Sequence, residues 1–404
     1  MRPMELPAAL QGRDIVCVGF ADWDTELWTN QHHLMSRLAR GNRVLFVESL
    51  GLRRPQLAGR DLRRIARRLR TGLQGPRRRS TAPGGAGQLD VLSPLVLPLH
   101  GNAAAEALNR RLLPALVSRA ARRIGMREPW LWSYVPQAEA LLGALEPSLV
   151  VYHCVDDISA HERIDTASFR AAEERFAGRA DLVLASAPEL ARRMRRLSGN
   201  VLEAPNVADT ALFATALDPG TATDPAIAAL PSPRLVFTGA ISAVKLDIPL
   251  LVELARARRD WTLALVGPVG LGDPTTDVSA LAAEPNVHLL GPRAYEQLPA
   301  VLRGADAGLI PYVRSELTDS IFPMKVYEYL AAGLPVVATP LPALSGVQEV
   351  ASEPDAASFR AALEGELAQD GPARRAQRSA AAASHSWEER LREIANAIEA
   401  LPPR

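Results

Sequence analysis

Residues 322–337 read FPMKVYEYLAAGLPVV, and this stretch decides most of what the sequence says about the fold. Pro323 fits the first position of a helix, where its missing N–H costs nothing, and Gly333 is placed to end that helix. The apolar, β-branched run from Leu334 to Ala338 then predicts a buried strand. A helix that leads directly into a buried strand is typical of a parallel sheet covered by helices.

The start of this predicted helix combines a cation with a carboxylate. Lys325 lies in the first turn, where free N–H groups and the positive end of the helix dipole attract anions. Glu328 follows three residues later on the same helix face. A ligand whose phosphates lie at the helix start could present ribose hydroxyls to this carboxylate, so the pattern predicts a nucleotide site. The alternative is an exposed ion pair, which stabilises a helix by only a few tenths of a kcal/mol.

Short apolar strand candidates alternate with helical patterns along the whole 404-residue chain. This alternation predicts an α/β fold with parallel sheets, and the length favours two domains. We therefore expect two Rossmann-like domains, and the Pro/Ala/Thr/Asp-rich stretch 218–233 has the composition of a linker. The predicted strands are 15–19, 44–47, 130–133, 149–153 and 182–185 in the first half, and 235–238, 263–266, 287–290, 308–310 and 335–338 in the second.

Three motifs resemble those of GT-B glycosyltransferases, close to the retaining family 4 type (glycosyl transferases group 1). Residues 323–337 fit the pattern P-x-K-x-x-E-Y-L-A-x-G-x-P-V-V of the family's donor site. The segment PNVAD at 205–209, with Phe213 after it, resembles the family's interdomain segment. The segment SWEE at 386–389 resembles the start of the C-terminal helix that crosses back to the first domain.

The resemblance implies a GT-B architecture, in which two Rossmann-like domains face a central cleft. It also implies transfer of a sugar from a nucleotide-sugar to a hydroxyl of a sugar, lipid-linked or other glycan acceptor, in cell-surface polysaccharide or glycolipid synthesis. Retention of configuration, without a metal or cofactor, is expected. The implied domains are an acceptor domain at 1–207 with a basic insertion at 50–88, a nucleotide-sugar-binding domain at 208–385 and a crossover helix at 386–404.

The chain departs from the family pattern at two positions. Ser320 stands where the family commonly has the first Glu of an E-x7-E motif, and Val207 replaces a Gly. The missing carboxylate favours a non-catalytic polysaccharide-assembly scaffold as an alternative. A nucleotide-sugar epimerase of the same fold, which would use one substrate and no acceptor, is a second alternative. An oxidoreductase is disfavoured because neither domain opens with G-x-G-x-x-G followed by a ribose-binding acid.

Further donor-side candidates lie in loops that follow predicted strands, where parallel sheets bind ligands. Gly239 would let a phosphate approach the backbone closely, and Lys245 in the same loop is a candidate second phosphate cation. Gly291 and Arg293 belong to a loop that resembles the family's base-contacting segment; a solvated loop arginine is the alternative for Arg293. Ser320 leads into the donor helix, where it can cap the helix, contact a pyrophosphate, or both.

Acceptor-side candidates lie in the first half of the chain. The strand at 149–153 runs into Asp156 and Asp157, and Asp156 resembles a polar residue near the reacting centre of related enzymes. Asp157 could instead cap the next helix, and His153 could be a core histidine. Trp28 and His32 are candidates for acceptor recognition, with core and capping roles as their alternatives. A zinc site at the His32–His33 pair is disfavoured because adjacent residues point to different helix faces.

The positive charge of the chain is concentrated in one stretch. The net charge is +1, yet eleven arginines and a single acid lie between Arg53 and Arg79. Residues 57–73 predict a basic amphipathic helix. It could pack on the first domain, or bind anionic lipid headgroups through Arg63, Arg64, Arg67 and Arg68. Nucleic acid is not expected as a partner, because no aromatic side chains for base stacking lie nearby.

The remaining composition predicts an ordinary globular protein. Apolar residues make up 48% and charged residues 23%, and no apolar stretch approaches the length of a membrane-spanning helix. The N-terminus lacks an apolar signal-peptide region. We therefore expect a cytoplasmic protein, with peripheral binding to the inner face of the cell membrane as a hypothesis tied to the basic stretch. Cys17 and Cys154 lie in separate apolar runs, which predicts buried free thiols.

Overall fold

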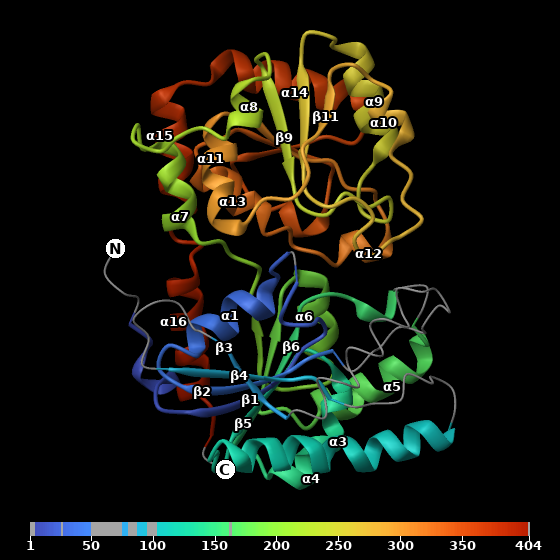
Figure 1. Cartoon of the computed structure of the whole chain (residues 1–404), viewed down its shortest axis with the longest axis vertical. Coiled ribbons are helices and arrows are strands. Elements are labelled where there is room, and N and C mark those ends of the chain that lie inside the picture. The colour runs from blue at the N-terminus through green and yellow to red at the C-terminus, as the bar shows by residue number, and fades with distance from the viewer. Residues whose placement is uncertain are drawn as a thin grey trace. The chain divides into compact units, whose positions relative to one another are not determined.

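The computed structural model describes residues 5–25, 27–49, 75–79, 87–94, 103–160 and 164–402. It divides into two compact units, shown in Figure 1: the first comprises Met1–Pro205 together with Leu391–Arg404, and the second comprises Asn206–Arg390. The linker predicted at 218–233 is wrong, because that stretch lies inside the second unit. There Asp224 caps helix α8 (Pro225–Ala228) by accepting hydrogen bonds from two backbone N–H groups.

The sheet of the first unit has eight strands in the order β3-β4-β2-β1-β5-β6-β7-β8. All neighbours are parallel except β3 and β4. The central strands are buried along nearly their whole length, as expected for a parallel sheet covered on both faces. The strands are β1 (Asp14–Val18), β2 (Arg43–Val47), β3 (Arg77–Arg79), β4 (Gln88–Leu92), β5 (Trp130–Ser133), β6 (Leu149–Cys154), β7 (Leu182–Ala185) and β8 (Val201–Glu203).

The helices of the first unit flank this sheet (Figure 1). The α-helices are α1 (Asn30–Leu38), α3 (Ala103–Arg123), α4 (Leu142–Leu145), α5 (Thr166–Ala177) and α6 (Pro188–Met194), and the 3₁₀ turns are η1 (Ala8–Leu10), η2 (Pro136–Leu141) and η3 (Ile158–Ala160). The last helix, α16 (Trp387–Glu399), begins in the second unit and continues into the first. Leu391, Ile394 and Ala395 of α16 are buried.

The sheet of the second unit is entirely parallel, in the order β11-β10-β9-β12-β13-β14. The direction of chain progression reverses between β9 and β12, so this pair is the topological switch point at which such sheets bind ligands. The strands are β9 (Arg234–Thr238), β10 (Thr262–Val266), β11 (Val287–Leu289), β12 (Ala307–Ile310), β13 (Val336–Ala338) and β14 (Val350–Ser352).

The second unit's helices cover both faces of its sheet (Figure 1). Tight packing is visible at Gly308 of β12, where an added Cβ would lie 2.4 Å from the ring of Tyr329. Besides α8, the α-helices are α7 (Thr210–Ala214), α9 (Ile248–Ala257), α10 (Ser279–Ala282), α11 (Leu298–Arg303), α12 (Glu316–Asp319), α13 (Lys325–Ala331), α14 (Ala356–Gln369) and α15 (Pro372–Ala382). The 3₁₀ turns are η4 (Thr215–Leu217), η5 (Tyr295–Gln297) and η6 (Pro342–Leu344).

Part of the basic stretch has a structure that the sequence did not predict. Three of its arginines form β3, whose side chains lie near carboxylates: Arg78 is 3.9 Å from Asp90, and Arg77 is 3.9 Å from Glu48. The predicted basic helix at 57–73, with Arg63, Arg64, Arg67 and Arg68, lies outside the described residues. Within the described ranges, no helix is long and apolar enough to cross a membrane.

Candidate functional site

Helix α13 holds the two residues of the predicted nucleotide site. It begins at Lys325, two residues after Pro323, so the prediction that Pro323 occupies the first helical position was wrong. The reason is a turn before the helix, in which the carbonyl of Pro323 accepts the N–H of Val326 at 3.2 Å. The predicted helix end is confirmed: Gly333 has φ +80°, and its N–H donates to the carbonyl of Leu330 at 2.9 Å.

Lys325 is not paired with a carboxylate. Its Nζ donates to the hydroxyl of Tyr312 at 2.8 Å and lies 5.0 Å from the ring centre of Phe237. No ion pair joins it to Glu328 among the described residues, so the exposed-ion-pair alternative is wrong. Because a hydroxyl and aromatic rings orient an ammonium without neutralising it, Lys325 keeps its charge available for an anion.

Glu328 is a buried carboxyl group, with 7% of its surface exposed. Burial raises its pKa from 4.5 to about 7, although the positive charge of Lys325 acts in the opposite direction. A carboxyl group whose pKa lies near neutrality is a candidate functional group. When ionised, it can accept hydrogen bonds from two neighbouring hydroxyls of a ligand.

Two glycines follow the strands beside Lys325. Gly239, after β9, has φ +127°, and a Cβ added there would lie 3.5 Å from Nζ of Lys325. Gly267, after β10, has φ +156°, and its Cβ would lie only 1.9 Å from the carbonyl oxygen of Gly239. The backbone conformation favours glycine at both positions, and at Gly267 there is also no room for a side chain. A phosphate can approach the backbone at Gly239 and meet the ammonium of Lys325 at the same point.

Lys245 belongs to the same corner. Its backbone N–H donates to the carbonyl of Ser242, and its own carbonyl accepts the N–H of Val313 at 2.8 Å. The next residue, Leu246, forms a β-bridge with Tyr312, the residue that holds Lys325. The whole 404-residue sequence contains two lysines among its 46 cationic Lys and Arg residues, and these are Lys245 and Lys325. Both lysines thus lie in the loops and helix of the predicted donor site.

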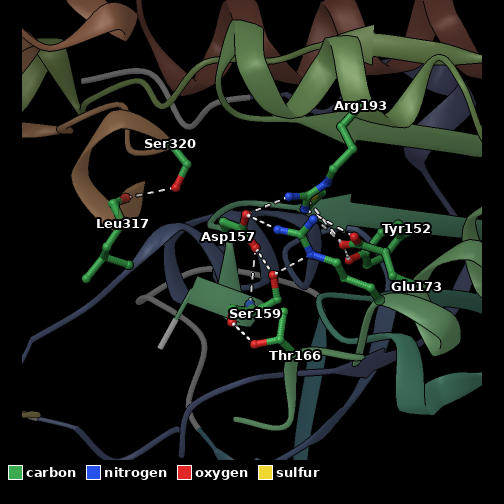
Figure 2. Close-up of polar contacts among 10 residues, drawn as sticks. Tyr152, Asp157, Ser159, Thr166, Glu173, Arg193, Leu317 and Ser320 are labelled. Carbon is green, nitrogen blue, oxygen red and sulfur yellow. Dashed lines mark hydrogen bonds and ion pairs between the residues drawn. The ribbon is translucent and has the colours of Figure 1, made fainter. Parts of the chain in front are cut away.

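The other predicted donor-side residues have contacts within the second unit. The hydroxyl of Ser320 donates to the carbonyl of Leu317 at 2.8 Å, as Figure 2 shows, so Ser320 ends α12 instead of capping the start of α13. Arg293 forms an ion pair with Asp224 at 2.8 Å and is not a freely solvated arginine. Its hydrogen bond lowers the pKa of Asp224. Gly291, with φ +71°, provides the turn that precedes it.

On the acceptor side, the end of β6 places three candidates close together in sequence. His153 is buried and stacks on Tyr134, with ring centres 4.8 Å apart, which agrees with a core histidine. Asp156 is partly exposed, and its carbonyl accepts the N–H of Ile158. Asp157 accepts the N–H of Ser159 at 3.2 Å and so caps η3, as its alternative reading predicted.

Asp157 also belongs to a partly buried ionic network that the sequence did not predict (Figure 2). Arg193 of α6 donates to Asp157 at 2.7 Å and pairs with Glu173 of α5 at 3.1 Å. Glu173 is buried and accepts a hydrogen bond from the hydroxyl of Tyr152, with 2.6 Å between the two oxygen atoms. A sequence signal for this network existed, because Glu173 lies at a helical spacing shared with two buried phenylalanines, Phe169 and Phe176.

The network sets the charge state of Asp157. Burial opposes its ionisation, but the hydrogen bond from Ser159 and the positive charge of Arg193 outweigh burial and lower its pKa. A carboxylate with a lowered pKa is a weak base near neutral pH. Of the two carboxylates after β6, Asp157 is therefore held within the loop by Ser159 and Arg193, and Asp156 stays the predicted candidate for proton transfer.

The predicted acceptor residues Trp28 and His32 differ in whether their side chains can contact an acceptor. Nδ1 of His32 accepts the N–H of Thr29 at 3.1 Å, and Nε2 donates to the carbonyl of Asp22 at 3.0 Å. Burial lowers the pKa of His32 to about 4, so the ring is neutral. Nδ1 thus takes part in capping α1 and Nε2 is held by the preceding loop, so the capping alternative describes His32. Trp28 stacks on His32 and is 41% exposed, so it is the one of the pair that can contact an acceptor.

Two further observations concern the cysteines and metals. Cys17 and Cys154 are buried free thiols, which confirms that prediction. Across the part of the chain that the structure describes, no three His, Cys, Asp or Glu side chains gather in a way that could hold a metal ion.

This fold and site place the protein among the two-domain α/β proteins of the GT-B class, and comparisons with known proteins agree. Residues 232–369 match the sequence model of the family described as "Glycosyl transferases group 1". Among solved structures, Anabaena HepE in complex with UDP and glucose aligns over 96% of this chain and 100% of its own, with a TM-score of 0.64 and 16% identity. Sucrose-phosphate synthase from Thermosynechococcus elongatus aligns over 96% and 98%, with a TM-score of 0.67 and 17% identity.

One sequence relative is closer over a shorter region. TuaH of Bacillus subtilis (strain 168), whose name describes a teichuronic acid biosynthesis glycosyltransferase, is 41% identical over 118 residues. The aligned segment spans 28% of this chain and 28% of TuaH. The resemblance to GT-B glycosyltransferases is thus confirmed: the fold matches along nearly the whole chain, and the family model matches most of the second unit.

Proposed function

We propose that this protein is a glycosyltransferase whose second unit binds a nucleotide-sugar and whose first unit binds the acceptor hydroxyl. The observation that carries the proposal is that helix α13 presents two complementary groups three residues apart. Lys325 is an ammonium with no carboxylate partner among the described residues, and Glu328 is a buried carboxyl group whose pKa is about 7. Both lie at the switch point of a parallel sheet, where nucleotides bind in folds of this kind. The family match over residues 232–369 supports the same assignment.

The donor is proposed to bind with its phosphates beside Gly239 and Lys325 and its ribose hydroxyls at Glu328. HepE has been solved with UDP and with UDP-glucose, which supports a uridine nucleotide-sugar as the first donor to test. During transfer the diphosphate departs with additional negative charge. The ammonium groups of Lys325 and Lys245 are proposed to stabilise that charge, which is the role that preorganised cations have in group transfer. Retention of configuration and independence from metal ions are part of this proposal.

The acceptor is proposed to be a sugar or lipid-linked glycan of the cell envelope, in line with the name of TuaH. Such an acceptor would be met at the cytoplasmic face of the membrane. The basic stretch with Arg63, Arg64, Arg67 and Arg68 is proposed to bind that surface. Replacing these four arginines by Gln should release the protein from vesicles that contain phosphatidylglycerol; unchanged binding would contradict this role.

One observation favours a second candidate function. Ser320 replaces the first carboxylate of the family's donor motif, which fits a non-catalytic scaffold that binds a nucleotide-sugar without transferring it. The two functions differ in whether nucleoside diphosphate is released.

A binding screen followed by a product assay tests the proposal. Thermal unfolding is first measured with a panel of nucleoside diphosphates and their sugars, because a ligand at a hundred times its Kd stabilises by about 2.7 kcal/mol. The donor that stabilises most is then incubated with a membrane extract, and nucleoside diphosphate release is followed. Release that depends on the extract supports a transferase, and binding without release supports the scaffold. An altered sugar on an intact nucleotide would instead identify an epimerase.

A further inference from the structure

The long helix α3 of the first unit presents one face that combines leucines with arginines. Its opposite side is buried in the core through Leu113, Val117, Ala120 and Ala121. At about 100° per residue, the exposed side chains fall within about 120° around the helix axis and span about 22 Å along it. We call this surface the α3 face. It consists of Leu108, Arg111, Leu112, Ala115, Arg119, Arg122 and Arg123.

The apolar part of the α3 face lies near the start of the helix. Leu108 is 43% exposed and Leu112 is 39% exposed. Because they are four residues apart, their side chains are neighbours on the helix surface. Single exposed leucines are common on protein surfaces, but an adjacent pair on a basic face suits a partner that accepts both apolar and cationic groups.

The arginines of the α3 face are not neutralised by the protein. None of Arg111, Arg119, Arg122 and Arg123 forms an ion pair with a carboxylate in the described ranges. Other exposed arginines are paired: Arg175 lies 3.1 Å from Glu139, and Arg256 lies 2.6 Å from Glu284. The α3 face is therefore a place where positive charge is left without an internal counter-charge.

We propose that the α3 face binds an anionic membrane surface. A helix that lies in the membrane interface has leucines that enter the acyl boundary and arginines that meet the headgroups, and the α3 face offers both. Each arginine near such a surface strengthens binding about fivefold. A single-stranded nucleic acid is a poorer partner, because the face has no aromatic side chain on which a base could stack. The proposal rests neither on sugar transfer nor on the basic stretch at 53–79.

Co-sedimentation of the full chain with vesicles tests this surface. Wild-type protein is expected to sediment with vesicles of phosphatidylcholine and phosphatidylglycerol at low salt, and to remain in solution with phosphatidylcholine alone. Replacing Arg111, Arg119, Arg122 and Arg123 by Gln should weaken binding about fivefold per arginine. Replacing Leu108 and Leu112 by Gln should weaken it severalfold without changing its salt dependence.

A matched control removes the same charge elsewhere. Arg175, Arg192, Arg195 and Arg256 are exposed but paired with carboxylates, and their replacement by Gln should leave most of the binding intact. Thermal unfolding verifies that every variant is folded. The proposal is overturned if wild type ignores anionic vesicles at low salt, or if the control loses as much binding as the α3 variant. It is also overturned if only the Arg63–Arg68 variant is released, or if an oligonucleotide binds more tightly than the vesicles.

Discussion

The ammonium of Lys325 lies 2.8 Å from the hydroxyl of Tyr312, which stands 13 residues earlier in the chain. Tyr312 comes directly after β12 and is itself fixed, because its N–H donates to the hydroxyl of Thr339 at 3.0 Å. A neutral hydroxyl thus sets the position of a full positive charge. This arrangement leaves the charge available for a phosphate and underlies the first prediction.

Replacing Lys325 by Ala should weaken nucleotide binding about ten- to hundredfold, because a charge-assisted hydrogen bond contributes roughly 1.5–3 kcal/mol. Tyr312→Phe should have a smaller effect, since it removes only the group that orients the ammonium. Calorimetry with the nucleotide from the binding screen measures both. Unchanged affinity in Lys325→Ala would remove the residue from the donor site.

Because the chain has two lysines, NMR signals from labelled lysine side chains can report on the candidate donor site. Reductive methylation with ¹³C-formaldehyde keeps the positive charge of lysine, and in this chain it labels Lys245, Lys325 and the N-terminal amine. Lys245→Arg and Lys325→Arg assign the two side-chain signals in an NMR spectrum. Nucleotide addition should shift both of them while the N-terminal signal stays in place. A spectrum that does not respond would contradict phosphate binding at either lysine.

Nucleotide affinity should rise as the pH increases through about 7, because the ionised form of Glu328 accepts hydroxyl hydrogen bonds and its pKa lies there. Glu328→Gln should bind about tenfold or more weakly above pH 7 and lose this dependence, keeping only that of the nucleotide phosphates. Isothermal titration across the pH range measures the effect. A wild-type profile identical to that of the variant would show that Glu328 does not contact the ligand.

The carboxyl group of Glu328 should also make the free energy of unfolding depend on pH when no ligand is bound. Its folded pKa is raised, so the folded state binds the proton more tightly than the unfolded state does between pH 4.5 and about 7. The free energy of unfolding therefore falls as the pH rises through this window, by on the order of 3 kcal/mol. Urea unfolding of wild type and Glu328→Gln at both ends of the window should show the decline in wild type alone.

Arg193→Met should lower the free energy of unfolding by about 3–5 kcal/mol. The substitution removes the cation that Glu173 and Asp157 share, and it leaves the buried carboxylate of Glu173 without a counter-charge. Arg192→Met is a control on the same helix: its pair with Glu189 is exposed, and its loss should cost at most about 1 kcal/mol. Adding Glu173→Gln to Arg193→Met should restore part of the stability. Equal effects for Arg192 and Arg193 would show that the network does not stabilise the fold.

Asp156→Asn should bind the donor normally and transfer sugar about 10²- to 10⁴-fold more slowly, the range expected when a general base is lost. Asp157→Asn should instead affect stability first, since Asp157 is held by Arg193 and Ser159. Calorimetry and single-turnover transfer separate the two. Near-normal transfer by Asp156→Asn would place the catalytic base elsewhere.

The sequence predicted the parts of the fold that depend on continuous apolar runs. All ten expected strands are present, because each is a short buried run between turn residues. The strands that were missed, β3, β4, β8 and β14, are short or polar. β3 consists of Arg77, Arg78 and Arg79 and pairs with β4, which places Asp90 opposite Arg78; no local pattern reveals this pairing.

The candidate site also contains residues that the sequence predicted and residues that it did not. Lys325, Glu328 and Gly333 could be found from one segment, because their spacing on a helix is local information. The hydrogen-bond partner of Lys325 could not be found in this way, since Tyr312 lies 13 residues earlier, in a loop that bridges to Leu246. Arg193 was missed for a related reason: it reaches Asp157 across two neighbouring strands, β6 and β7.

The division of the chain has a practical consequence for protein production. The first unit needs Leu391–Arg404 in addition to Met1–Pro205. A gene fragment that stops at residue 205 would omit the buried side chains of Leu391 and Ile394, and its product would be prone to aggregation. The second unit, Asn206–Arg390, is contiguous in sequence, but a fragment of it would end inside α16. A first unit for separate study would need residues 391–404 attached through a designed loop or supplied as a peptide.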